Sequence, residues 1–228
     1  MAFLAHRDLT AVEEMDKPDC DPAKLDHTYA QFPLVNRAVA GWHRTWARYI
    51  RPVLSTSRVN TLLDIGSGGG DVPRALARWA ARDGFELRIT AIDPDERAYA
   101  FASSQPTTPA LTFRRAFSSE LVAEGERFDV VTSNHVLHHL SPQELGGLLR
   151  DSELLSKRLA LHSDIERTRI GFALFSVATL PLRGSFIRED GLTSIRRCYL
   201  AKELRAVVPE GWRVEGQVPF RNLLVYRA

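Results

Sequence analysis

A glycine-rich turn between a predicted strand and a predicted helix is the strongest chemical signal in this chain. The apolar run over residues 59–65 is typical of a buried parallel strand, and a helical pattern covers residues 72–81. Alternating glycines occupy the turn between them: Gly66, Gly68 and Gly70. Because glycine has no side chain, such a turn brings backbone N–H groups close to a bound ligand. The dinucleotide pattern G-x-G-x-x-G would require glycine at Asp71, so the alternatives are a plain tight turn or a dinucleotide loop of unusual spacing.

An acidic residue closes the next predicted strand. Residues 87–93 are strand-like and end in Asp93, and a helical pattern starts near Asp95. At the carboxyl tip of a parallel strand, a carboxylate can accept hydrogen bonds from both hydroxyls of a ribose. An Asp that precedes a Pro more commonly forms a turn or caps a helix. We interpret Asp93 as a ribose-binding residue because it follows the glycine turn at the customary distance.

Histidines gather near the ends of the fourth and fifth predicted strands, over residues 128–133 and 158–165: His135, His138, His139 and His162. The pKa of imidazole lies near neutrality, which suits a group that removes a proton from a substrate. In a doubly wound sheet the carboxyl ends of the strands face the ligand crevice. We interpret His135, His139 and His162 as candidate general bases and His138 as a packing residue. Each of the three also has an alternative role as a capping or hydrogen-bonded core residue.

These motifs resemble those of one enzyme family. The acidic-x-G-x-G-x-G spacing from Asp64 to Gly70 resembles motif I of the class I S-adenosylmethionine (SAM)-dependent methyltransferases. Residues 128–140 resemble the fourth-strand segment of small-molecule methyltransferases of the ubiquinone and menaquinone type, which often leads into a similar His-His-Leu. Residues 190–197 resemble a segment of bacterial methyltransferases associated with aromatic polyketide pathways.

The resemblance implies SAM as the cofactor. In the family the glycine turn cradles the methionine part of SAM, and residues after the third strand contact the adenine. The implied cofactor contacts come from Asp64, Gly66, Ser67, Gly68, Gly70, Asp93, Pro94, Ala116, Phe117 and Asn134. Phe117 is equally compatible with a core position, and Asp64 with organising the turn.

Alternating strand and helix patterns predict an α/β fold with a doubly wound, Rossmann-like sheet. The resemblance adds a C-terminal hairpin, with strands over residues 212–219 and 223–227, and so a seven-stranded sheet with an antiparallel last strand. An apolar helix over residues 167–182 and a charged loop over residues 183–198 follow the fifth strand. We expect one domain, 1–228, made of N-terminal cap helices (1–50), a SAM-binding core (51–166), a substrate-lid insertion (167–198) and a C-terminal helix and hairpin (199–228).

The composition is that of an ordinary globular chain, with 228 residues, 44% hydrophobic, and a net charge of +2 at pH 7. Near-neutral charge without a basic arm argues against nucleic acid as a partner. Cys20 and Cys198 make neither a disulfide framework nor a zinc site, so we expect metal-independent chemistry in the cytoplasm. Residues 1–20 are expected to be partly mobile, without a signal peptide, and the apolar stretch 170–182 is too short for stable membrane insertion.

We expect an enzyme that transfers a methyl group from SAM to a small phenolic or polyketide-like acceptor, with oxygen as the favoured acceptor atom. The aromatic segment 22–50 and the helix over residues 167–182 are expected to enclose this acceptor. The chain is expected to act as a monomer or homodimer. Two alternatives stay open: C-methylation of a quinone-type ring, and a SAM-binding accessory protein without catalysis.

Overall fold

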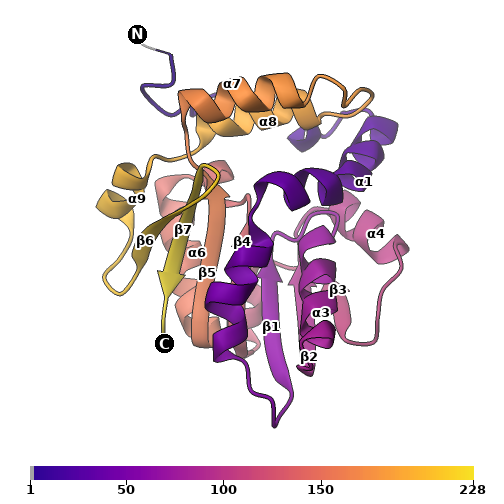
Figure 1. Cartoon of the computed structure of the whole chain (residues 1–228), viewed down its shortest axis with the longest axis vertical. Helices are drawn as coiled ribbons and strands as arrows, with labels where there is room; N and C mark the ends of the chain where they lie inside the picture. The colour runs from indigo at the N-terminus through magenta and orange to yellow at the C-terminus, as the bar shows by residue number, and fades with distance from the viewer. Residues whose placement is uncertain (1–2) are drawn as a thin grey trace.

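Seven strands form one sheet in the order β3-β2-β1-β4-β5-β7-β6 in the computed structural model, which describes residues 3–228 (Figure 1). The strands are β1 (Asn60–Ile65), β2 (Leu87–Ile92), β3 (Leu111–Arg114), β4 (Phe128–Asn134), β5 (Ser156–Ile165), β6 (Arg213–Gln217) and β7 (Arg221–Tyr226). Strands β1 to β5 pair in parallel, whereas β7 runs antiparallel to both β5 and β6. The predicted Rossmann-like sheet with an antiparallel last strand is confirmed.

The helices fall into a core group and a group at one end of the sheet. The core helices are α3 (Asp71–Arg82), α4 (Glu96–Ser104), α5 (Ser118–Ala123), α6 (Pro142–Leu155) and α9 (Ala201–Val207). The N-terminal part contains α1 (Pro22–Val39) and α2 (Trp42–Thr45), followed by a π-helical turn (Trp46–Ile50) and a 3-10 turn (Arg51–Val53). Helices α7 (Arg169–Ala178) and α8 (Ile187–Arg197) follow β5.

Apolar side chains cover both faces of the sheet. Along β1, Leu62 packs into the core on one face and Leu63 into the core on the other, and Val130 and Val131 divide in the same way along β4. Successive strand residues point to opposite faces, so a strand that is buried on both sides is a continuous apolar run. Helix α3 and residues 42–53 cover the first face, and helices α5, α6 and α9 cover the second.

Helices α1, α7 and α8 lie as a layer across the carboxyl ends of the parallel strands (Figure 1). We call this layer the lid. Tyr29 of α1 packs on Phe101 of α4, with ring centroids 5.1 Å apart, and Phe186 at the start of α8 joins the same apolar cluster. In residues 3–228, no helix combines the length and the apolar composition that crossing a bilayer requires.

Two expectations about local structure are wrong. The charged loop expected over residues 183–198 contains helix α8, which buries Ile187 and Ile195 together with the charged residue Asp190. Arg221 and Asn222 fall between the two expected C-terminal strands, where we expected the turn. They are instead the beginning of β7, and both side chains are almost fully buried. The chain instead turns at residues 218–220.

The N-terminal segment, residues 3–20, packs onto the molecule, contrary to the expected mobility. Arg97 of α4 donates hydrogen bonds to the carbonyl oxygens of Met15 (3.1 Å) and Lys17 (3.0 Å). Arg197, at the end of α8, donates to the carbonyl oxygen of Ala11 (2.7 Å). The segment therefore connects a core helix with a lid helix.

Asp129 near the start of β4 links the amino-terminal ends of β4 and β1, at the end of the sheet opposite the lid. Its carboxylate accepts hydrogen bonds from Arg58 at 2.6 and 2.9 Å and from the Thr61 N–H group at 3.0 Å. The bonds from Arg58 lower the pKa of Asp129 despite its burial. The stability that this carboxylate contributes is thus complete above about pH 4 and is lost as the pH falls through the lowered folded pKa.

Replacing Asp129 with Ala is expected to lower the free energy of unfolding by about 1–3 kcal/mol, because the Thr61 N–H group loses its buried acceptor. Arg58→Ala should cost clearly less, since the Arg58 side chain is 43% exposed and its ion pair is screened by solvent. Urea unfolding at pH 7 measures both values. Equal losses in the two variants would show that the ion pair, and not the buried acceptor, dominates.

Candidate functional site

A cavity of about 540 Å³ lies between the carboxyl ends of the strands and the lid. This volume is typical of sites that enclose a small molecule. The glycine turn and several carboxyl groups form one half of its wall, which we call the polar half. Apolar side chains from α1, α7 and α8 form the other half, which we call the apolar half.

The glycine turn is shaped by backbone conformation and by packing. Gly66, Gly68 and Gly70 have φ angles of 69°, 51° and 77°, a region that favours glycine. A methyl group on Gly66 would lie 2.5 Å from Cγ2 of Val136, and one on Gly70 would lie 2.6 Å from Cζ of Phe113. A methyl group on Gly68 would meet nothing within 4 Å, because Gly68 faces the open cavity. Packing therefore requires the outer two glycines, and the middle one leaves room for a ligand.

Three carboxyl groups line the polar half: Asp64, which is buried, and Asp71 and Asp93, which are partly buried. Burial raises the pKa of each, and that of Asp64 reaches about 7. One oxygen of Asp93 accepts from the Gly68 N–H group (2.8 Å) and the other from the Asp95 N–H group (3.0 Å), which orients the carboxylate. A cation beside such groups favours their ionised form, so the polar half suits a positively charged ligand.

His135 follows β4 in a backbone conformation that is rare outside glycine, with φ at 61°. Its N–H group donates to the carbonyl oxygen of Ser163 (2.9 Å), and Arg221 donates from Nη1 to its Nε2 (2.7 Å). Burial and the neighbouring guanidinium hold the pKa of His135 well below its usual value. The ring is therefore neutral and carries its proton on Nδ1, which makes it a poor general base.

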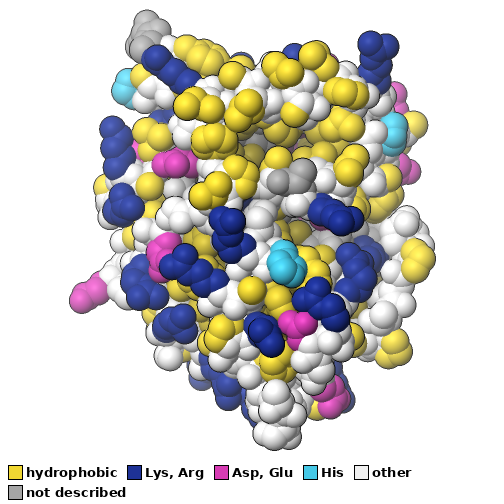
Figure 2. Space-filling model, viewed as in Figure 1, with side chains coloured by type: hydrophobic (Ala, Val, Ile, Leu, Met, Phe, Trp, Pro, Cys, Tyr) yellow, Lys and Arg dark blue, Asp and Glu magenta, His cyan; other side chains and the backbone are white. Residues whose placement is uncertain are grey.

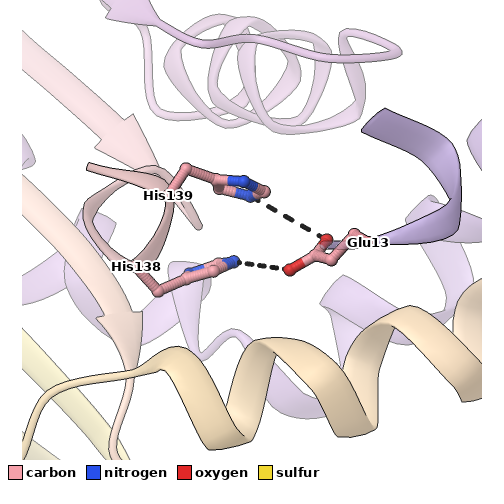
Figure 3. Close-up of side chains that lie close together, drawn as sticks. All are labelled: Glu13, His138 and His139. Carbon is pink, nitrogen blue, oxygen red and sulfur yellow. Dashed lines mark ion pairs between the residues drawn. The ribbon is translucent and has the colours of Figure 1, made fainter. Parts of the chain in front are cut away.

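His138 lies between two carboxylates. Its Nδ1 is 2.9 Å from Oδ1 of Asp164, and its Nε2 is 3.2 Å from Oε1 of Glu13 (Figure 3). Burial favours the neutral ring, but Asp164 in particular raises the pKa of His138 well above 6.5. Burial alone would raise the pKa of Glu13, but contact with His138 outweighs it and lowers this pKa to about 2. His138 is thus an imidazolium that ties the N-terminal segment to β5, in agreement with a packing role.

His139 lies beside His138, on the cavity wall and partly exposed (Figure 3). Its Nδ1 is 3.2 Å from Oδ2 of Asp16, and its Nε2 is 3.9 Å from Oε2 of Glu13. A carboxylate at Nδ1 favours the tautomer in which Nε2 can accept a proton. These two contacts orient the ring of His139 on the cavity wall.

Glu13, His138 and His139 also bring three potential metal-ligand atoms within 4.8 Å of one another. His138 shares a second such group with Asp164 and Cys198. Because the protonated His138 ring has no free lone pair, a metal ion at either group would first have to displace a proton.

Apolar side chains of the lid form the apolar half of the cavity: Phe32, Val35, Val39, Leu174, Phe175, Ala178, Ile187 and Ile195. A methyl group on Gly191 of α8 would lie 2.3 Å from the ring of Phe175, so glycine makes room for this aromatic side chain. Helix α7 also exposes Ile170 and Val177. Figure 2 shows hydrophobic side chains gathered over the part of the molecule where Figure 1 places α7.

Most of the predicted site residues meet at this cavity. Its wall includes Asp64, Gly66, Ser67, Gly68, Asp93, Pro94, Asn134, His135 and His139. Gly70, Ala116, Phe117 and His162 lie outside the wall. Ala116 is buried in the core, whereas Phe117 is 61% exposed at the start of α5.

His162 is buried within the sheet, away from the cavity. Its Nδ1 is 2.7 Å from Oγ of Ser133, and its ring stacks on Trp212 at a centroid distance of 5.3 Å. Burial lowers the pKa of His162 to about 3. The contacts are those of a neutral core histidine, and its predicted role as a base has no support from this geometry.

Six charged residues of the wall were not predicted as site residues: Glu13, Asp16, Asp71, Asp95, Asp190 and Arg221. Glu13 and Asp16 reach the site from a segment that carries no local pattern, and Arg221 lies in the gap between the two expected C-terminal strands. Asp71 had a local signal, because it follows the glycine turn directly at the start of α3.

Comparisons with known proteins agree with the fold and the motifs. Residues 62–156 match a family model described as a methyltransferase domain. The chain is 31% identical over 118 residues to a ubiquinone biosynthesis O-methyltransferase of Methylobacterium sp. (strain 4-46), covering 50% of this chain and 44% of that protein. It is 37% identical over 100 residues to the enzyme of that name from Caulobacter vibrioides, covering 42% and 36%. The chain thus spans less than half the length of these relatives.

Solved structures share the fold at low sequence identity. The plantazolicin methyltransferase BpumL in complex with SAH aligns with a TM-score of 0.66 at 11% identity, covering 94% of this chain and 92% of that one. A SAM-dependent methyltransferase from Aquifex aeolicus aligns with a TM-score of 0.59 at 15% identity, covering 91% and 98%. The acidic polar half of the cavity also fits SAM, whose sulfonium and amino groups are cations. The family model identifies residues 62–156 as a methyltransferase domain, and the relatives and the fold agree with S-adenosylmethionine as its cofactor.

Proposed function

We propose that this protein transfers the methyl group of SAM to a hydroxyl group of a small, largely apolar acceptor of phenolic or polyketide-like character. One observation carries the proposal: the same cavity joins an acidic half beside the glycine turn to an apolar half beneath the lid. A cationic methyl donor and an uncharged aromatic acceptor need these two environments side by side. The resemblance to ubiquinone biosynthesis O-methyltransferases supports oxygen as the acceptor atom.

In the polar half, the chain binds and orients the cofactor. When bound, SAM supplies an electrophilic methyl group on a sulfonium ion. Asp93 is held by two backbone N–H groups and is placed to accept hydrogen bonds from the ribose. Gly68 allows close approach of the cofactor, and Asp64, with a pKa near 7, ionises readily beside a cation. Ser67, Pro94 and Asn134 stay proposed contacts.

In the apolar half, the lid excludes water and holds the acceptor against the methyl group. Alignment of donor and acceptor at about 3 Å can lower the barrier by several kcal/mol. His139 is the proposed general base for a neutral hydroxyl, because Asp16 orients its ring. We do not propose His135 as the base, because its Nε2 accepts from Arg221 and its pKa is lowered.

Two other functions are compatible with the same cavity. C-methylation of a quinone-type ring would use the same cofactor and lid and would release a ring proton. A SAM-binding accessory protein would use the polar half alone. The proposed base at the junction of the two halves, His139, favours an active enzyme.

Labelled SAM and a panel of phenols and hydroquinones separate these functions. We expect the label to appear as an aryl methyl ether, identified by mass spectrometry and NMR with all ring hydrogens retained. A product that has lost a ring hydrogen would establish C-methylation instead. SAM binding without product from any acceptor, in a folded protein, would favour the accessory role.

Replacing Asp93 with Ala should weaken SAM binding by about one to two orders of magnitude, because it removes a charge-assisted acceptor worth roughly 1.5–3 kcal/mol. Isothermal titration calorimetry measures this change. Glu124→Ala is a suitable control, since Glu124 pairs with Arg114 on the surface and does not line the cavity. Unchanged affinity in Asp93→Ala would remove Asp93 from the cofactor site.

Replacing His139 with Ala should slow methyl transfer by about 10²–10⁴-fold while leaving SAM affinity nearly unchanged. Asp16→Asn should cause a smaller loss of rate, because it affects only the orientation of the ring. His162→Gln is the matched control: a histidine outside the cavity, whose loss should affect stability more than rate. A near-parental rate in His139→Ala would rule out His139 as the base.

A further inference from the structure

Arg221 is a buried cation on the cavity wall. It begins β7, pairs with Ile165 at the carboxyl end of β5, and is 1% exposed. Its guanidinium donates to Oγ of Ser163 from Nε and Nη2, to Oδ1 of Asn134 from Nη2, and to Nε2 of His135 from Nη1. All three partners are uncharged, and a guanidinium has five N–H bonds, so one N–H bond of Nη1 is left for a further partner.

The charges around Arg221 do not pair with it directly. In residues 3–228, no carboxylate oxygen comes within 4.0 Å of its guanidinium. Asp164 is the carboxylate with the strongest effect on the pKa of Arg221, but its oxygens bond His138. Glu13 is paired with the same His138 ring. The Cys198 thiol is neutral, because burial raises its pKa to about 11. Burial lowers the pKa of Arg221 to about 10, which leaves it charged at neutral pH.

The neighbouring side chains hold the guanidinium of Arg221 at the cavity wall by accepting its hydrogen bonds. Because Nε2 of His135 accepts from Arg221, the proton of the neutral ring is on Nδ1. Arg221 and His135 both line the cavity, next to Phe220 and Ile165. A buried cation without an ion pair is costly unless an anion approaches it, and Arg221 keeps one N–H bond free on the cavity wall.

We propose that Arg221, held in place by its three uncharged partners, forms an oxyanion subsite that binds the acceptor as its phenolate or enolate, so that the acceptor is already ionised when the methyl group is transferred. The hydroxyl proton leaves to solvent through His139 before the transfer step. In that step the acceptor oxygen forms a bond to the methyl carbon, and the carbon–sulfur bond breaks with its electron pair going to sulfur. The products are neutral ether and neutral thioether.

This inference deepens the proposed function and rests on it, because it assigns a role in binding the acceptor. The competing ligand for Arg221 is the carboxylate of the cofactor's methionine part. Two features favour the acceptor. Arg221 lies on β7, which is separated from the glycine turn after β1 by β4 and β5. Phe220, the residue before it, also lines the cavity and packs close to Gly171 of α7, a lid helix.

The test uses 4-nitrophenol as a probe, because its phenolate absorbs visible light, and SAH as the cofactor product, which prevents turnover. Binding to the full chain with SAH should lower the apparent pKa of the probe by about one to two units, a 10- to 100-fold gain in ionisation. In Arg221→Gln this shift should disappear, and in Arg221→Lys part of it should return. SAH affinity, measured by calorimetry, should change less than about threefold in both variants.

Arg167→Gln is the matched control, because Arg167 is equally buried but pairs with Glu203 outside the cavity wall. It should reduce stability and leave the probe spectrum as in the parent. A probe that binds the parent without any change in pKa would overturn the subsite while leaving the proposed function in place. Loss of SAH affinity in Arg221→Gln, with the probe shift retained, would place Arg221 on the cofactor instead. A parent that binds SAH but no phenol would contradict both proposals.

Discussion

The buried imidazolium of His138 is the interaction on which the arrangement of the site depends. Asp164 at the end of β5 holds one side of the ring, and Glu13 of the N-terminal segment holds the other. Glu13 also accepts from Ser194 of α8, and Asp190 of the same helix accepts from the N–H groups of residues 14 and 15. One charged ring thereby joins the sheet, the N-terminal segment and the lid, and all three contribute to the cavity wall.

The charges on the two sides of that junction differ in sign. On the side of β1 and β2, carboxyl groups with raised pKa values face the cavity and suit a cationic cofactor. On the side of β5 and β7, Arg221 faces it as a cation without a directly paired carboxylate. A positively charged methyl donor and an anionic acceptor would each meet the opposite charge, and the methyl group passes from one region to the other.

Local motifs identified most of the residues that line the polar half of this cavity. The glycine turn and Asp93 each lie between a strand and the helix that follows it. Short-range spacing in the sequence was therefore sufficient to locate them. The part of the cavity wall around Arg221 and the N-terminal segment depends on contacts between segments far apart in the chain. Arg221 meets His135 across 86 positions, and Ser194 meets Glu13 across 181. His162 has the residue type and strand position of a base, but only the packing of Trp212 places it in the core.

A crystal structure with SAH and a nitrophenol bound tests the central claim, that one cavity holds the cofactor and the acceptor together, most directly. The account predicts SAH along the turn at residues 66–70, with its ribose on Asp93, and the phenol oxygen within hydrogen-bond distance of Arg221. It also predicts the phenol ring against Phe175 under the lid. SAH elsewhere, or a phenol bound only outside the lid, would contradict it.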